Sequence, residues 1–144
     1  MVSFDVVSLF NSIPQQLAID DVDQLLAERY EEGDRPLKSE HLLELLRYCL
    51  KTYFTFDGQM YEQIKGIPMG FPISGLIAEV VLQRVEHLVF TKYQPNFWAH
   101  YVNNTFVVVK TFDTEHLKEL LNSVDPDIQF TMEAETNNQL PFLD

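Results

Sequence analysis

Hydrophobic and polar positions follow two different periods along this chain, and the changes of period mark its predicted strands and helices. Residues 2–7 form a short apolar run interrupted by Asp5. A run of this length predicts a core strand, with Asp5 buried near the mouth of a sheet. The pattern then changes to helical spacing.

Two helices are predicted next, and both should face the core. Apolar residues recur at helical spacing from Pro14 to about Tyr30, and Gly33 is expected to close this helix. Pro36 and Ser39 are expected to open a second helix that is rich in leucine and runs to Leu50.

A hairpin and a long helix fill the middle of the chain. Residues 53–56 and 59–64 are β-prone runs, and Asp57-Gly58 between them is a strong hairpin signal. The loop 65–75 contains glycine and proline, and helical periodicity returns over residues 76–90. This second pattern predicts a buried helix with Ser74 as its N-terminal cap.

The last third of the chain predicts a second hairpin and a short helix. Asn103-Asn104 divides the β-prone runs 98–102 and 105–110, and asparagine tolerates the positive φ of a tight turn. Asp113 or Thr114 should cap the helix that follows. Closing strands are expected at residues 128–132 and 140–143.

This order of elements predicts an α+β fold with one antiparallel sheet backed by helices. The 144 residues, 46% of them hydrophobic, suffice for a single core. The apolar stretch 76–82 contains Glu79 and is too short to cross a membrane. The N-terminus does not resemble a signal peptide, and the lone Cys49 cannot form an internal disulfide, so we expect an intracellular protein of the nucleus or cytoplasm.

The net charge changes the expected partners. A formal charge of −12 and an isoelectric point near 4.6 argue against a free-standing nucleic-acid binder, because phosphate groups are neutralised by clustered lysine and arginine. Any nucleic-acid groove would need basic residues from other segments.

The residues that suggest a particular chemistry lie in five stretches of the chain. They read SFDVVSLFNSIP, YFTFDGQMYEQIKGIPMGFPISG, FWAHYVNNTFVVVK, HLKELLNSVDPDIQFTMEAE and NNQLPFLD. In this order they resemble the reverse transcriptases of Penelope-like retroelements, which are relatives of telomerase. The resemblance covers nearly the whole chain and implies a polymerase palm, a ferredoxin-like or RRM-like sheet, with a partial fingers hairpin. It further implies that residues 1–144 are a single partial reverse transcriptase domain without upstream fingers and thumb.

The first stretch resembles motif A of that family. The resemblance implies that Asp5 binds the catalytic Mg²⁺ ions, because a hard cation prefers charged oxygen. It also implies that Phe10 excludes a 2′-hydroxyl by its bulk. Taken alone, the stretch fits better a core strand whose Asp5 caps Ser8 or its neighbours.

The loop 65–75 resembles motif B, which approaches the template and the incoming nucleotide. Glycine lets a backbone make such an approach. Phe71 departs from the family, because a small residue is usual after the second glycine. An ordinary strand-to-helix turn is the alternative interpretation. The matching positions are Gly66, Pro68, Gly70, Pro72 and Ser74.

The stretch around Tyr101 resembles motif C, in which two aspartates normally occupy the positions of Asn103 and Asn104. Tyr101 would contact the primer end. Asparagine offers a neutral carbonyl oxygen, so we expect weak or absent Mg²⁺ binding and an inactive copy. The alternative is that the two asparagines are only a turn.

The resemblance implies an RNA template, a DNA primer and deoxynucleotides as partners, with weak nucleic-acid binding in this copy and no membrane. Other hypotheses stay open. One is a non-catalytic palm-fold domain that binds protein partners. Another is a residual enzyme that uses Mn²⁺, which tolerates neutral ligands better than Mg²⁺.

Overall fold

A computed structural model of the chain describes residues 1–31, 33 and 37–142. The chain divides into two compact units. We call residues 1–9 and 82–144 the sheet unit, and residues 10–81 the helical unit.

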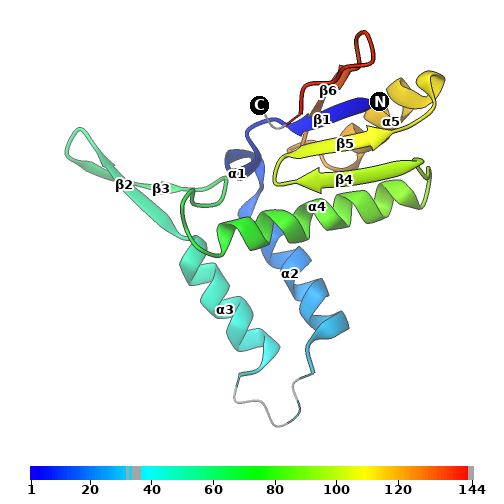
Figure 1. Cartoon of the computed structure of the whole chain (residues 1–144). Helices are drawn as coiled ribbons and strands as arrows, with labels where there is room; N and C mark the ends of the chain where they lie inside the picture. Colours follow the sequence, from blue (N-terminus) through cyan, green and yellow to red (C-terminus); the bar gives the residue numbers. More distant parts are fainter. Residues whose placement is uncertain (32, 34–36, 143–144) are drawn as a thin grey trace. The chain divides into compact units, whose positions relative to one another are not determined.

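The sheet unit is built on a four-stranded sheet with the order β4-β5-β1-β6, in which neighbouring strands are antiparallel. Figure 1 shows β1, β4, β5 and β6 side by side. The strands are β1 (Val2–Val6), β4 (Phe97–Tyr101), β5 (Asn104–Val108) and β6 (Phe130–Ala134). The N-terminal strand is thus an inner strand of the sheet.

One face of this sheet is packed and the other is open, because successive side chains of a strand point to opposite faces. Phe4 lies on the packed face, where its ring centroid is 6.4 Å from that of Trp98. Trp98 in turn meets Phe90, from the end of helix α4 (Ser74–Phe90), edge-on at 5.2 Å. Helix α5 (Thr114–Val124) buries Leu117 and Leu121. The α+β fold with an antiparallel sheet backed by helices is confirmed.

Two details of the sheet unit differ from the prediction. Residues 140–142 form no strand, and Leu143 lies outside the described residues. The start of α5, which follows the 3-10 helix η1 (Thr111–Asp113), has no side-chain cap. Asp113 accepts a hydrogen bond from the hydroxyl of Tyr93 instead, and Thr114 donates to the carbonyl of Thr111. Both side chains therefore have other partners.

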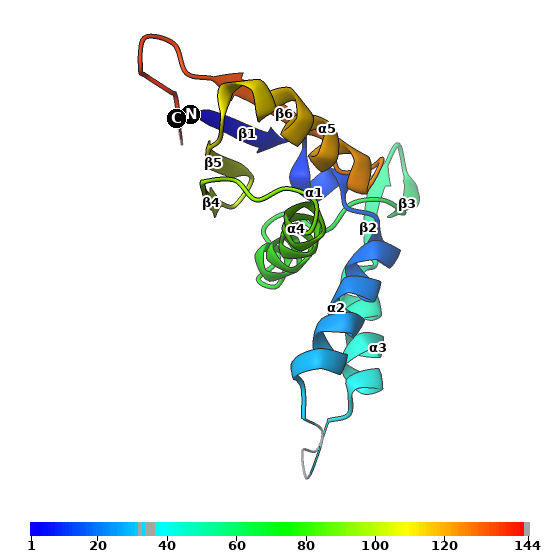
Figure 2. The same cartoon turned by 90° about the vertical axis from the view of Figure 1, so that its right-hand side faces the viewer.

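Helices α2 (Gln15–Arg29) and α3 (Ser39–Leu50) pack against each other in the helical unit. Figure 2 shows them side by side. Helix α2 ends at Arg29, and Tyr30 donates its backbone N–H to Leu26, so Gly33 does not close it. Pro36 lies outside the described residues.

The expectation that both helices face the core holds only in part, as α3 shows. Leu43, Leu46 and Leu50 are buried, whereas Leu45 and Tyr48 are 58% and 64% exposed. Buried positions three and four apart lie on one stripe of a helix, and Leu45 lies outside that stripe. The run of leucines therefore predicted a wider buried face than α3 has.

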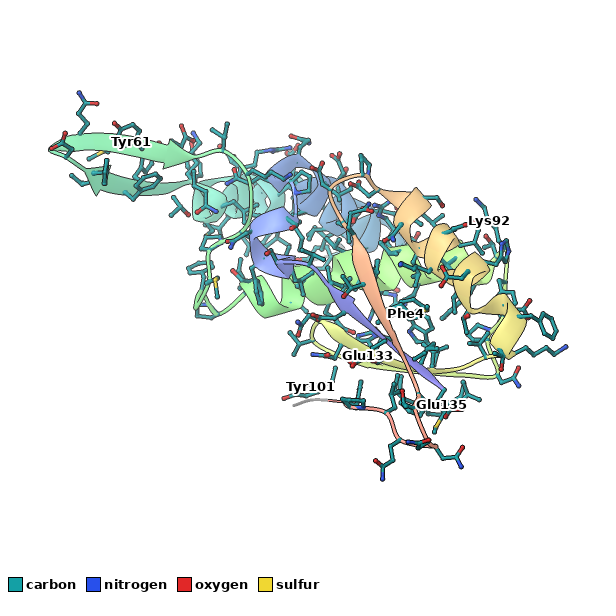
Figure 3. All side chains as sticks on the ribbon, turned by 90° about the horizontal axis from the view of Figure 1, so that it is seen from above. Phe4, Tyr61, Lys92, Tyr101, Glu133 and Glu135 are labelled. Atoms are coloured by element: carbon teal, nitrogen blue, oxygen red, sulfur yellow. The ribbon has the colours of Figure 1, made fainter. Side chains whose placement is uncertain are left out.

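Strands β2 (Thr52–Phe56) and β3 (Gln59–Gln63) form the predicted first hairpin. Asp57 and Gly58 have φ angles of 50° and 75°, as a two-residue turn with two positive angles requires. The rings of Phe54 and Tyr61 stack across the strands at 5.5 Å, and Tyr61 is labelled in Figure 3.

The predicted cap of α4 is wrong. The helix starts at Ser74 itself, and the Ser74 hydroxyl is buried without a hydrogen-bond partner among the described residues. The short helix α1 (Leu9–Ser12) was not predicted, because four residues are too few to show a period. Within residues 1–31, 33 and 37–142, we find no helix of the length and apolarity required to cross a membrane.

Candidate functional site

The turn between β4 and β5 places two asparagines beside the acid of β1. Asp5 and Asn104 are directly opposite in the antiparallel ladder of β1 and β5. Asn103 Nδ2 donates to Asp5 Oδ1 at 2.7 Å, and Asn104 Nδ2 donates to Asn103 Oδ1 at 3.2 Å. A chain of hydrogen bonds therefore joins the three side chains, as expected from their assignment to adjacent elements.

The asparagine pair does not form the centre of the turn. Tyr101 pairs with Asn104, so the two turn residues are Val102 and Asn103. The positive φ, 55°, belongs to Val102, although a β-branched side chain is poorly suited to it. The backbone carbonyl of Asn103 accepts the N–H of Val6 at 3.0 Å, which extends the ladder of β1 into the turn. This non-local bond fixes a register in which the turn lies one residue earlier in the chain than predicted.

Asp5 is exposed, so the prediction of a buried acid is wrong. Its neighbours Phe4 and Val6 are buried on the packed face, and strand alternation places Asp5 on the open face. Its carboxylate is accessible to solvent and to ligands.

The charge at this site is small. Asp5 contributes one carboxylate, whereas Asn103 and Asn104 contribute neutral amides. Within the described part of the chain, no group of three histidine, cysteine, aspartate or glutamate side chains could hold a metal ion. These three residues therefore do not match the carboxylate-rich oxygen set that a pair of Mg²⁺ ions prefers.

A second group of the predicted residues lies in the helical unit. The loop after β3 is bound to α1 through its backbone, because Gly66 N–H donates to Ile13 and Ile67 N–H donates to Phe10 at 2.7 Å. Gly66 has φ of 87°, and a Cβ there would lie 2.9 Å from the Cα of Asn11. Only glycine fits this approach, which keeps Phe10 beside the loop.

The amide of Gln15 reinforces this loop, and no pattern in the sequence predicts this role. Its Nε2 lies 3.1 Å from the carbonyl of Leu50, 3.0 Å from that of Gln63 and 3.3 Å from that of Gly66. A glutamine at the start of a helix is ordinary, so its partners could be found only in the tertiary structure.

The remaining residues of the predicted site are spread over both units. Tyr101, in the sheet unit, is 65% exposed. Phe71, in the helical unit, is 36% exposed, and its carbonyl accepts the N–H of Ser74. Gly70 has φ of 77°, and Pro68 and Pro72 are half-buried and exposed.

No protein-family model matches the chain, and neither does any curated protein. Solved structures do. The structure of apo telomerase from Candida tropicalis, truncated from its C-terminal domain, matches 99% of this chain with a TM-score of 0.70 and 14% identity. Telomerase from Candida albicans, in complex with the TWJ fragment of telomeric RNA, matches 99% with a TM-score of 0.72 and 13% identity.

The chain has a telomerase-like fold. Telomerase is a reverse transcriptase, so this is a reverse-transcriptase-like fold with a palm-like sheet. At these identities the likeness concerns the fold alone. The chain spans 32% and 28% of the two telomerase chains.

Proposed function

We propose that this chain is the palm region of a Penelope-like reverse transcriptase whose ancestral activity, RNA-templated DNA synthesis by two-metal nucleotidyl transfer, is lost in this copy. The observation that carries the proposal is the hydrogen bond from Asn103 to Asp5. An amide donor there occupies one oxygen of the carboxylate that should face a cation. The ordered sequence stretches and the telomerase-like fold support the ancestry.

The physical reason for inactivity is charge. Two metal ions in such an enzyme lie about 3.5 to 4 Å apart. Unit charges about 4 Å apart repel by about 4 kcal/mol at an effective dielectric near 20, and two dications by roughly four times that. The expected set of three acids is reduced to Asp5, so the residues present do not fit a pair of Mg²⁺ ions.

Mn²⁺ accepts neutral ligands more readily than Mg²⁺ does, so it is the metal to test for residual activity. Phe10, Gly66, Phe71 and Tyr101 would contact the nucleotide, template or primer in the ancestral enzyme. The net charge of −12 leaves the phosphate contacts of template and primer to basic segments outside these 144 residues. Such a protein would work inside the cell.

The test is template-dependent incorporation of deoxynucleotides with Mg²⁺ or Mn²⁺. The chain is grafted into a full-length relative with and without the changes Asn103→Asp and Asn104→Asp. We expect the unaltered graft to be inactive and the doubly changed graft to regain incorporation. A third graft that adds Asp5→Asn to the double change is the control, and it should lose activity again.

Two results would count against the proposal. Activity in the unaltered graft would remove the claim of inactivity. Failure of the doubly changed graft would mean that the asparagines are not the decisive lesion, and Phe71→Ala in that background would then test the other departure from the family.

The second candidate function is a non-catalytic palm-fold domain that binds protein partners. The net charge favours proteins over nucleic acid, and the β2-β3 hairpin exposes apolar side chains, among them Phe56 at 69% and Met60 at 73%. A filter-binding assay with a primer-template duplex tests for a nucleic-acid partner. Measurable affinity at physiological salt would favour the nucleic-acid partner.

A further inference from the structure

A cavity of about 510 Å³ lies on the open face of the sheet unit. Its lining includes Ser3 and Asp5 from β1, Asn104 from β5, and Thr131 and Glu133 from β6. The segment after β6 contributes Phe142. Cavities of this volume accommodate small organic groups.

Two carboxylates give the cavity its charge. Asp5 is opposite Thr131 and Ser3 is opposite Glu133 in the ladder of β1 and β6, so the two acids are diagonal neighbours on one face. Such neighbours are about 7 to 8 Å apart, which leaves space for a cationic group between them. No lysine, arginine or histidine of the described chain lines the cavity. Figure 3 labels Glu133 on β6.

Ser3 places a hydroxyl in the lining of the same cavity. The residue is 8% exposed, and strand alternation puts its side chain on the face that carries Asp5. Its hydroxyl is open to the cavity, where it can donate to or accept from a ligand group.

An aromatic ring supplies the remaining contact. Phe142 is half-buried, and its ring packs edge-on against Phe106 at 5.8 Å, which in turn contacts Phe97 at 6.1 Å. This row of rings holds Phe142 at the wall of the cavity. An aromatic face attracts planar cations.

We propose that this cavity binds a guanidinium group. A guanidinium has five N–H donors in one plane, which can serve two separated carboxylates and a serine hydroxyl while the plane stacks on a phenylalanine. An ammonium is a compact, strongly hydrated charge with three donors, so it should bind more weakly. Phosphate-bearing ligands are disfavoured, because both charged groups in the lining are acids.

Asp5 is shared with the proposed function, whereas Ser3, Glu133 and Phe142 have no role in it.

The test is a titration of the 144-residue chain with Nα-acetyl-arginine methylamide. Binding is monitored by NMR at low salt in the presence of EDTA. We expect saturable binding that shifts the amide signals of Ser3, Thr131 and Glu133. N-acetyl-lysine methylamide should bind at least about threefold more weakly. Glu133→Gln should weaken the arginine probe about three- to tenfold, and Glu119→Gln, on the exposed face of α5, should leave its affinity unchanged.

Phe142→Leu is the second variant, because it removes the ring without removing charge, and it too should weaken binding. The proposal is overturned if the arginine probe does not saturate, if the lysine probe binds equally well, or if Glu133→Gln matches the unaltered chain. Template-dependent incorporation is a separate readout, so failure here leaves the lost polymerase activity to its own test.

Discussion

Asn103 Nδ2 donates to Asp5 Oδ1 at 2.7 Å, and this contact joins residues 98 positions apart in the chain. The bond needs an amide on one side and a carboxylate on the other. It stabilises the metal-free sheet unit, whereas an acid at position 103 would repel Asp5. An amide at position 103 therefore favours the stability of the metal-free sheet unit, whereas an acid there favours metal binding. A double substitution should reveal this difference.

We expect the combined change Asn103→Asp and Asn104→Asp to lower the free energy of unfolding by about 1–3 kcal/mol at pH 7 in EDTA, because a donor is lost and like charges meet. Adding Mg²⁺ should raise the melting temperature of this variant more than that of the unaltered chain. Thermal melts with and without MgCl2 measure both effects.

The control for this experiment adds Asp5→Asn to the double variant, which should recover part of the lost stability in EDTA. A double variant as stable as the unaltered chain in EDTA would show that the carboxylates do not meet in solution.

Gly66→Ala should lower the free energy of unfolding by about 2–4 kcal/mol, because positive φ and a clash with backbone act together. The new Cβ would lie 2.9 Å from the Cα of Asn11. Gly75→Ala is the matched control, since it is helical and open, and it should be neutral or stabilising by about 0.5 kcal/mol. Urea denaturation compares them, and equal midpoints would refute the close approach at Gly66.

Val102→Gly should raise the free energy of unfolding by about 0.5–1 kcal/mol. Its φ of 55° is costly for a β-branched residue, and glycine removes that cost while adding some chain entropy to the unfolded state. Val108→Gly, at a strand position of β5, should destabilise instead. Equal losses of stability in the two variants would show that Val102 does not have a positive φ.

Tyr93→Phe should change stability in a pH-dependent way. Burial, the hydrogen bond to Asp113 and the negative charge of Asp113 raise the pKa of Tyr93 above 10.0. A raised pKa gives stability that is complete below pH 10 and declines as the pH rises toward the folded-state pKa. The variant should therefore be about 1 kcal/mol less stable at pH 7, with a smaller deficit near pH 10.5.

Urea denaturation of both proteins at the two pH values measures this difference, and the other tyrosines cancel because both proteins share them. A deficit that stays constant with pH would show that Tyr93 does not titrate differently on folding.

Local signals in the sequence were sufficient where a structure depends on neighbouring residues. Asp57-Gly58 predicted the first hairpin correctly, because the positive φ angles of its turn depend mainly on those two residues. Helix α4 was also found from its period. The cap at Ser74 failed, since a serine can start a helix in more than one way and its surroundings decide which.

Only part of the candidate site could be predicted from the sequence. The sequence identified Asp5, Asn103 and Asn104 as residues whose chemistry belongs together, and the fold placed them in one hydrogen-bonded chain. It could not show that Ser3 and Glu133 would share a cavity with Asp5, because neither belongs to a recognisable pattern. It also missed Gln15, whose carbonyl partners come from distant segments.

By itself the sequence determined which residues alternate, which repeat at helical spacing and which carry charge, because these properties depend on composition and short-range order. The tertiary structure decided that Asp5 is exposed, that Val102 takes the strained turn position and that β1 lies between β5 and β6. Strand order and register depend on hydrogen bonds between residues far apart in the chain, and no local pattern specifies those partners.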